Sequence, residues 1–262
     1  MSTSPNPPLP ASPHTSSDQL EKEKQAAARA ALAWVRDGMT LGLGTGTTAS
    51  YFIQFLGQRL RNEPSGIEAV VSSTGSEQLA KESGIRVISP RRGLRLDLTV
   101  DGADEIAPDL SLLKGRGGAL LREKVLAQVS RYFLVIADSS KRVDQLGVHH
   151  PLPVEVVPFA APWVADQVEN LGGKPTLAMN RQSPQEPYLT DQRNYILECK
   201  FPDITDPRTL GEQIEDIPGV VGHGLFVGFA HAAMVAQGND LWILRRGQAP
   251  ALFTGSAGPA EP

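Results

Sequence analysis

The feature that most constrains the fold of this chain is an alternation of short apolar runs with segments of helical periodicity. The apolar runs combine β-branched and other apolar residues and are bounded by turn residues, as buried strands are. They fall at residues 39–43, 67–72, 85–88, 96–100 and 132–137. Strands that alternate with helices in this way predict an α/β fold with a Rossmann-like, open and mostly parallel sheet.

A different pattern begins near residue 151. Strands are expected at residues 152–157, 174–177, 194–201 and 220–227, and helices at 162–171 and 206–216. This order predicts a smaller α+β domain of the ferredoxin-like kind over 151–227. Two further strands, at 232–236 and 241–244, are expected to return to the main sheet. The Rossmann-like catalytic domain would then comprise 18–150 and 228–250.

Both ends of the chain are expected to lie outside the fold. Residues 1–17 are rich in proline and serine and have no apolar core, which predicts a disordered leader rather than a secretory signal. Residues 251–262 are a tail of small residues, and we expect them to be disordered as well.

Composition narrows the class of protein. Of the 262 residues, 40% are hydrophobic and 21% are charged, as in an ordinary globular protein. The formal net charge of −4, without a basic block, argues against nucleic acid as a partner. No apolar run approaches the ~20 residues that span a membrane. The single cysteine, Cys199, cannot form an internal disulfide, which fits a cytoplasmic protein.

Three polar clusters follow three of the expected strands of the main sheet. They are Gly44-Thr45-Gly46-Thr47-Thr48, Asp101-Gly102-Ala103-Asp104-Glu105 and Asp138-Ser139-Ser140-Lys141. The carboxyl ends of parallel strands meet at one edge of the sheet, which is where such folds bind their ligands. We therefore expect the three loops to form one site.

The glycine–threonine loop lies between a strand and a helix. This layout presents backbone N–H groups and the positive end of the helix to an anion. The loop does not match the dinucleotide fingerprint, because Thr47 stands where the third glycine belongs, and it lacks the lysine of a nucleotide P-loop. We expect it to bind a single phosphate. A plain strand–helix turn is the alternative.

A carboxylate on an apolar helix face is a candidate for proton transfer. In the helix expected at 118–130, Glu123 lies in line with Ala119 and Ala127, whereas Lys124 belongs to a polar, solvated strip. Burial on an apolar face raises the pKa of a carboxyl group toward that of a general base. The alternative is a structural glutamate paired with a nearby lysine or arginine.

In these motifs and their order the sequence resembles type A ribose-5-phosphate isomerases, over about residues 19–244. The matching segments are Gly42-Leu43-Gly44-Thr45-Gly46-Thr47-Thr48, Asp101-Gly102-Ala103-Asp104-Glu105, residues 114–124, Ala137-Asp138-Ser139-Ser140-Lys141, Leu152-Pro153-Val154-Glu155-Val156 and Ile217-Pro218-Gly219-Val220-Val221. The resemblance implies interconversion of ribose 5-phosphate and ribulose 5-phosphate in the non-oxidative pentose phosphate pathway. It also implies a homodimer or homotetramer that uses no metal or organic cofactor.

The resemblance also points to site residues. Glu123 matches the proton acceptor of the family. The chemistry suits its neighbours, because Asp101 and Asp104 can move protons on the sugar oxygens, and Lys114 can stabilise the charge of an enediolate. The positions that match substrate-binding segments are Thr45, Gly46, Thr47, Thr48, Asp101, Gly102, Ala103, Asp104, Lys114, Gly115, Arg116, Gly117 and Lys141.

The sequence departs from the family pattern at two places. Arg116 stands where the lysine–glycine loop usually has glycine, which bears on the geometry of that loop. Gln192 and Arg193 replace a usual Asn-Gly pair in a turn of the smaller domain, where we expect no effect on the chemistry.

Three other functions are compatible with this fold, because a fold does not fix a function. A 6-phosphosugar isomerase–deaminase would turn over glucosamine 6-phosphate, and a CoA-transferase-like enzyme would form a thioester on a glutamate. A non-catalytic sugar-phosphate sensor would lack a base, and Glu123 argues against it. His149, His150, His223 and His231 fit no zinc spacing, so we expect no metal site and place them at the surface or in loops.

Overall fold

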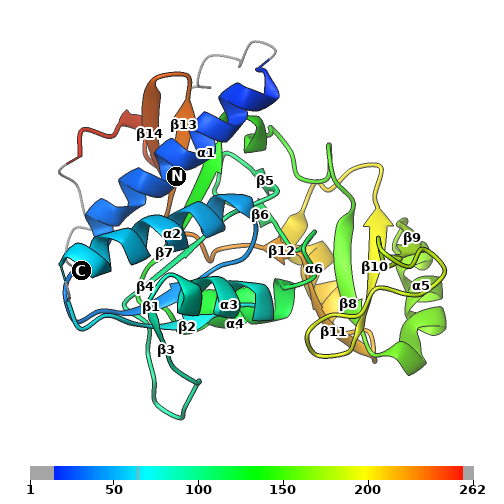
Figure 1. Ribbon diagram of the computed structural model, residues 1–262. Helices are drawn as coiled ribbons and strands as arrows, with labels where there is room; N and C mark the ends of the chain where they lie inside the picture. Colours follow the sequence, from blue (N-terminus) through cyan, green and yellow to red (C-terminus); the bar gives the residue numbers. More distant parts are fainter. Residues whose placement is uncertain (1–14, 64, 256–262) are drawn as a thin grey trace.

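The computed structural model describes residues 15–63 and 65–255, and an eight-stranded sheet lies at its centre (Figure 1). In order across the sheet, the strands are β15 (Ala251–Leu252), β14 (Asp240–Arg245), β13 (Ala232–Gln237), β7 (Phe133–Asp138), β4 (Leu98–Asp101), β1 (Thr40–Leu43), β2 (Glu68–Val71) and β3 (Arg86–Val87). From β13 to β3 all neighbours are parallel, whereas β14 and β15 are antiparallel. The predicted α/β fold with a mostly parallel main sheet is therefore confirmed.

Helices cover both faces of this sheet. They are α1 (Ser17–Ala31), followed by η1 (Leu32–Trp34), then α2 (Thr47–Asn62), α3 (Thr74–Glu82) and α4 (Leu120–Val129). Side chains alternate along a strand, so β7 contacts both layers. Its Leu134 and Ile136 belong to the core shared with α1, α2 and α3, whereas Phe133 and Val135 pack with Ala127 of α4. The helix that follows β1 and the one that precedes β7 therefore lie on opposite faces.

A second, antiparallel sheet has four strands and lies at the right of Figure 1. Its strands, in order, are β11 (Val220–His223), β8 (Leu152–Val156), β10 (Tyr195–Lys200) and β9 (Lys174–Leu177), with η3 (Pro158–Ala160), α5 (Ala161–Asn170) and α6 (Pro207–Glu215) between them in the chain. The chain order is strand–helix–strand–strand–helix–strand, as the apolar pattern predicts. Its core is formed by aliphatic residues such as Val154, Val164 and Ile214.

The strand predicted for 220–227 is wrong as a single element, because its two halves join different sheets. β11 pairs with β8, whereas β12 (Leu225–Phe226) joins a three-stranded sheet with β6 (Leu112–Leu113) and β5 (Glu105–Ile106). Gly224 separates the halves. Its N–H donates to Pro153 O and its carbonyl accepts from Lys114 N, at 2.8 and 2.9 Å. This exchange of partners joins the second sheet to the lysine–glycine loop.

The predictions for the two ends are partly wrong. Residues 251–252 form β15, because β14 offers them backbone partners, and Phe253 packs against the main core. The rest of the predicted tail, 256–262, lies outside the described residues, as do residues 1–14 of the predicted leader. Helix α1 begins at Ser17, and the side chain of Ser16 caps it by accepting from Gln19 N at 3.2 Å. Within the described ranges, no helix combines the length and apolarity needed to cross a membrane.

Candidate active site

The candidate site lies where the direction of winding of the main sheet changes, between neighbouring strands β1 and β4. Ligands of open α/β sheets bind at such points. The loops that follow the two strands are in direct contact, since Thr45 N donates to Asp101 Oδ1 at 3.1 Å. Gly44 permits this approach, because a Cβ at that position would lie 2.0 Å from the same oxygen. The glycine is therefore required by the close packing of the loops.

A cavity of about 230 Å³ opens above these loops. Its lining residues are Lys24, Thr45, Gly46, Thr47, Thr48, Gly102, Ala103, Asp104, Lys114, Gly115, Arg116, Gly117, Glu123 and Lys141. The structure thus brings together the residues that the sequence nominates from all three loops and from α4. Two residues differ from the prediction. Asp101 lies beneath the cavity rather than on its wall, and Lys24 of α1, which no sequence motif includes, lines the cavity.

A buried lysine and two buried carboxyl groups form a cluster at the floor of the cavity, which Lys114 and Glu123 line and beneath which Asp101 lies. Lys114 Nζ lies 3.0 Å from Asp101 Oδ2 and 3.2 Å from Glu123 Oε2, and it donates to Gly102 O at 2.5 Å. An ammonium group carries three protons, so these acceptors can engage all of them. The side chains of the three ionisable residues are no more than 5% exposed. Their charges therefore act on each other with little screening by water.

The pKa of Glu123 is raised to about 8. Burial is the main cause, and the negative charge of Asp101 adds to it, while the Lys114 ammonium opposes both. For Lys114, burial alone would lower the pKa, but the carboxylates of Asp101 and Glu123 outweigh it and raise the pKa above its ordinary value. The cavity floor therefore has a permanent cation beside a carboxyl group that exchanges its proton near neutral pH.

The two loop aspartates have different surroundings. Asp101 is fully buried, and its Oδ1 accepts from the backbone N–H groups of Thr45 and Gly102 while its Oδ2 faces Lys114. Asp104 is half-buried on the cavity wall, and its Oδ2 accepts from Arg116 N at 3.2 Å. Only Asp104 of this pair lies where a bound ligand could touch it.

The start of α2 forms the opposite end of the cavity. Gly46 precedes the helix and has no side chain to cap it, so the first backbone N–H groups of α2 stay available. Thr47 and Thr48 line the cavity beside them. Thr45 behaves differently, because its Oγ1 lies within 3.2 Å of the hydroxyl oxygens of Ser72, Ser73 and Ser76. This hydroxyl cluster holds the loop from below, and periodicity alone could not identify it.

Two lysines complete this end, one from α1 and one from η2 (Ser139–Lys141). Buried Glu23 connects their elements. Its Oε2 accepts from Ser139 N at 3.0 Å and from Ser139 Oγ at 2.7 Å, and its Oε1 accepts from Gly238 N at 2.8 Å. Glu23 precedes Lys24, and Ser139 lies two residues before Lys141. Glu23 therefore joins η2 to α1, while the ammonium of Lys24 lies 3.0 Å from Glu21 Oε2.

The prediction that Lys124 and His223 face solvent is wrong. The Lys124 side chain is 16% exposed, and its Nζ lies 3.5 Å from Glu215 Oε1 and 3.4 Å from His223 Nε2. Burial lowers the pKa of Lys124 to about 8 although Glu215 opposes it, and burial lowers the pKa of His223 to about 3. The cause is that α6 and β11 cover this side of α4, which its own periodicity does not reveal.

The other histidines are placed as expected. His149 and His231 are exposed and His150 is half-buried in its loop. Within residues 15–63 and 65–255, no group of three or more histidine, cysteine, aspartate or glutamate residues is arranged to hold a metal ion.

The two departures from the family pattern both lie near the site. Arg116 lines the cavity, and its Nη1 lies 3.5 Å from His150 Nε2. Arg193 adopts φ +66°, a left-handed conformation that glycine would adopt without strain. The neighbouring Asp191 contacts Thr74 and Arg122, so this turn is not confined to the smaller unit. The expectation that the Gln192-Arg193 turn has no effect on the chemistry stays a prediction.

Together these features define an α/β protein with a buried lysine–carboxyl cluster in a cavity that also reaches the start of a helix. The family model for ribose 5-phosphate isomerase A (phosphoriboisomerase A) matches residues 68–240. The chain is 44% identical over 223 residues to the ribose-5-phosphate isomerase A of Thermosynechococcus vestitus, covering 85% of this chain and 94% of that protein. It is 45% identical over 235 residues to that of Gloeobacter violaceus, covering 88% and 99%.

The solved structures that are similar to this chain belong to the same family as its sequence relatives. The ribose 5-phosphate isomerase A of Methanocaldococcus jannaschii superposes with a TM-score of 0.82 at 34% identity, covering 86% of this chain and 99% of that chain. A D-ribose-5-phosphate isomerase in complex with phospho-erythronic acid superposes with a TM-score of 0.84 at 38% identity, covering 87% and 99%. This chain belongs to the ribose 5-phosphate isomerase A family. The family and the enzyme class expected from the motifs are thereby confirmed.

Proposed function

We propose that this protein interconverts ribose 5-phosphate and ribulose 5-phosphate through an enediolate, with Glu123 as the base that carries the proton. One observation carries this assignment. Glu123 lines the cavity, is buried, has its pKa raised to about 8, and lies 3.2 Å from a lysine ammonium. A general base works best when its pKa lies near the operating pH.

The proton and charge balance of the reaction suits this arrangement. The ionised carboxylate of Glu123 takes the proton from C2 of the open-chain aldose, a C1–C2 double bond forms, and negative charge moves to the oxygen on C1. A proton then moves from the oxygen on C2 to the oxygen on C1. Glu123 returns its proton to C1, and C2 becomes the carbonyl carbon. Atoms and electrons balance within the substrate and Glu123, so the scheme needs no external oxidant or reductant.

Lys114 would stabilise the charge of the intermediate. In the free protein its ammonium faces the carboxyl group of Glu123, at 3.2 Å. Once Glu123 has accepted the proton it is neutral and attracts the ammonium less. The positive charge of Lys114 then becomes available to the enediolate at the moment when the negative charge develops there.

The two aspartates would have separate roles. Asp104 lies on the cavity wall, so we assign it the transfer of protons between the sugar oxygens. Asp101 lies beneath the wall and accepts from two backbone N–H groups. Its role is to hold Lys114 in place and, through its charge, to keep the pKa of Glu123 high.

The phosphate group would bind at the opposite end, at the start of α2. Free N–H groups and the helix dipole attract an anion there. Thr47 and Thr48 add hydroxyl donors, and Lys24 and Lys141 add positive charge. A relative that is 38% identical was solved with phospho-erythronic acid, a phosphorylated sugar acid, which supports this class of ligand. The expected homodimer or homotetramer and the cytoplasmic location remain predictions.

A direct assay tests the proposed function. Ribose 5-phosphate should be converted to ribulose 5-phosphate at the same rate with and without a chelator, and glucosamine 6-phosphate should not be turned over. Absence of ribose 5-phosphate turnover by the folded protein would contradict the proposal. Turnover of glucosamine 6-phosphate would instead favour an isomerase–deaminase.

A further inference from the structure

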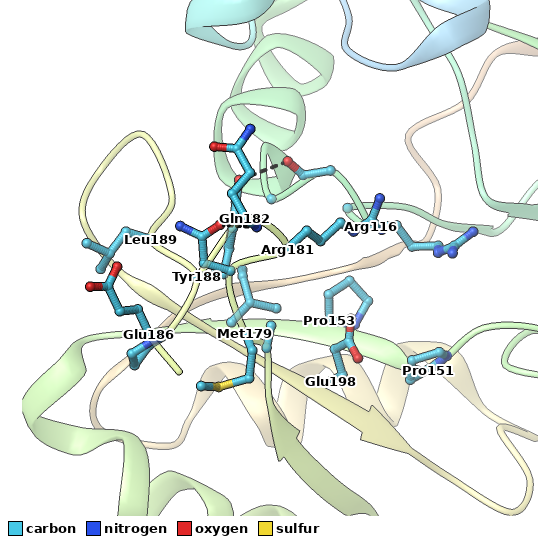
Figure 2. A pocket seen from close by; sticks show the side chains of 17 residues that line it. Arg116, Pro151, Pro153, Met179, Arg181, Gln182, Glu186, Tyr188, Leu189 and Glu198 are labelled. Atoms are coloured by element: carbon cyan, nitrogen blue, oxygen red, sulfur yellow. Dashed lines mark hydrogen bonds between the residues drawn. The ribbon is translucent and has the colours of Figure 1, made fainter. Parts of the chain in front are cut away.

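The segment between β9 and β10, residues 178–194, extends from the second sheet toward the main one, and we call it the strap. It contacts the catalytic loop, residues 114–118, through Tyr188. The hydroxyl of Tyr188 donates to Gly117 O at 3.1 Å (Figure 2). Its ring lies against Gly118, where an added Cβ would be 2.4 Å from the ring. Tyr188 therefore fixes the end of the loop that begins with Lys114.

The strap makes a second set of contacts through Asp191. Its carboxylate accepts from Thr74 N at 2.8 Å and from Thr74 Oγ1 at 3.0 Å, and it lies 3.4 Å from Arg122 Nη1. Thr74 follows Ser73, a member of the hydroxyl cluster that holds Thr45. Arg122 precedes Glu123 in α4. Asp191 thus joins the element beneath the phosphate loop to the helix that carries the base.

The strap itself is anchored to the second sheet. Buried Glu155 of β8 accepts from Thr190 Oγ1 at 2.8 Å and from Asn194 Nδ2 at 2.9 Å. The turn between these residues contains Arg193 in its left-handed conformation. Because Glu155 anchors both ends of this turn, Asp191 is held in a defined position relative to the second sheet.

The contact through Tyr188 matters because the catalytic loop has open space on this side. A cavity of about 530 Å³ lies beside the loop, lined in part by Ile196. Its walls also include Pro153 and Met179 (Figure 2). The start of the loop is supported at Gly115, where an added Cβ would lie 3.1 Å from Pro153 Cγ, whereas its end at Gly117 and Gly118 meets Tyr188. Tyr188 also lines the cavity and bridges it at one end.

We propose that the strap positions the catalytic machinery, with Tyr188 and Asp191 as positioning residues for the isomerisation proposed above. Neither residue lines the catalytic cavity. Tyr188 acts on the backbone that presents Lys114 and the N–H groups of the loop to the enediolate. Asp191 acts on the spacing between the phosphate loop and Glu123. Small displacements of such groups lower rates strongly, because charge stabilisation and proton transfer depend on geometry.

The test compares Tyr188→Phe and Asp191→Asn with the wild type and with Leu189→Ala, a change of an exposed strap residue. Turnover of ribose 5-phosphate by the wild type is measured first. For Tyr188→Phe, loss of one hydrogen bond should lower kcat roughly 3- to 10-fold. KM and the melting temperature should stay close to those of the wild type, because the phosphate end and the core are unchanged. Asp191→Asn should lower kcat and raise KM, whereas Leu189→Ala should match the wild type.

The outcomes separate this proposal from the function on which it rests. An active wild type with unchanged kcat in both Tyr188→Phe and Asp191→Asn would overturn the role of the strap alone. An equal loss of kcat in Leu189→Ala, or losses that follow the melting temperature, would also overturn it, since the strap would then be merely structural. An inactive, folded wild type would overturn the proposed function and the positioning role with it.

Discussion

Lys114 Nζ lies 3.2 Å from Glu123 Oε2, and the two side chains are 3% and 5% exposed. A cation and a carboxyl group at this distance, with little water between them, determine each other's protonation. The ammonium keeps part of Glu123 ionised although burial and Asp101 oppose it. The pair therefore has two states, an ion pair that can accept a proton and a protonated form in which the ammonium keeps Asp101 as its charged partner.

The pH dependence of the reaction follows from this pair. Only the ionised carboxylate of Glu123 can accept a proton, and its pKa is raised from 4.5 to about 8. We therefore expect kcat/KM for ribose 5-phosphate to rise with pH from 6 and to reach half of its plateau near pH 8. A pH–rate profile between pH 6 and 9.5 measures this. A profile that is flat from pH 6 upward would mean that the base has an ordinary carboxyl pKa.

Replacing the lysine should alter both the rate and this profile. Lys114→Ala removes the cation that we propose stabilises the enediolate, so kcat should fall by about 10²–10³-fold. It also removes the charge that lowers the pKa of Glu123, so the remaining activity should need a higher pH. The matched control is Lys81→Ala, a change of an exposed lysine on α3. If KM rose and kcat stayed constant, Lys114 would bind phosphate instead.

Changes in the glycine–threonine loop, residues 44–48, should affect KM rather than kcat. In the double variant Thr47→Val/Thr48→Val, two hydroxyl donors are lost while side-chain shape is kept. Phosphate binding contributes about equally to the ground state and the transition state, so KM should rise far more than kcat falls. Thr176→Val, an exposed change in β9, serves as the control. An unchanged KM in the double variant would exclude this loop from the site.

Glu23 should affect binding without touching the substrate. Glu23→Gln replaces one of two acceptor oxygens by a donor, so a buried N–H or hydroxyl group of Ser139 or Gly238 loses its partner. This should destabilise the fold by about 1–3 kcal/mol. It should also raise KM several-fold, because η2, which carries Lys141, loses part of its attachment to α1. Steady-state kinetics and thermal melts measure both effects.

The surface change Glu169→Gln in α5 is the control for Glu23. It is the same glutamate-to-glutamine change, made at a residue that does not line the cavity. A lower melting temperature in Glu23→Gln with an unchanged KM would contradict the link between Glu23 and the position of Lys141.

Much of the site was predictable because it follows from local patterns. The three loops could be placed together, since parallel strands direct their carboxyl ends to one edge. The burial of Glu123 followed from its position between Ala119 and Ala127 on one helix face. Its raised pKa then followed from burial itself.

Other features depend on contacts between distant segments and could not be predicted. Lys24 reaches the cavity because α1 packs on β7 and β13, and because Glu23 bonds to Ser139, far along the chain. Lys124 is covered by elements that follow about 90 residues later, which helical periodicity cannot show. Asp101 and Asp104 have different surroundings because of the path of the loop that contains them. A loop has no regular periodicity from which the direction of its side chains could be predicted.

The domain boundaries proposed from the sequence remain a prediction. The small sheet of β5, β6 and β12 joins the two predicted domains, because Leu225 pairs with Leu113. A boundary drawn between 227 and 228 therefore leaves β12 with the smaller domain although it pairs with the main one. The change from alternating to split strand order near residue 151 was visible in the sequence, whereas this connection was not.

The central claim is that Glu123 carries the proton, and exchange of the C2 hydrogen of ribose 5-phosphate with deuterated water tests it most directly. Glu123→Gln keeps the shape of the side chain and removes its basicity. In a folded variant that still binds phospho-erythronic acid, exchange should vanish and kcat should fall by at least ~10²–10⁴-fold. Glu169→Gln should exchange like the wild type. Retained exchange in Glu123→Gln would contradict the account and would assign proton abstraction to another residue, with Asp104 on the cavity wall as the first candidate.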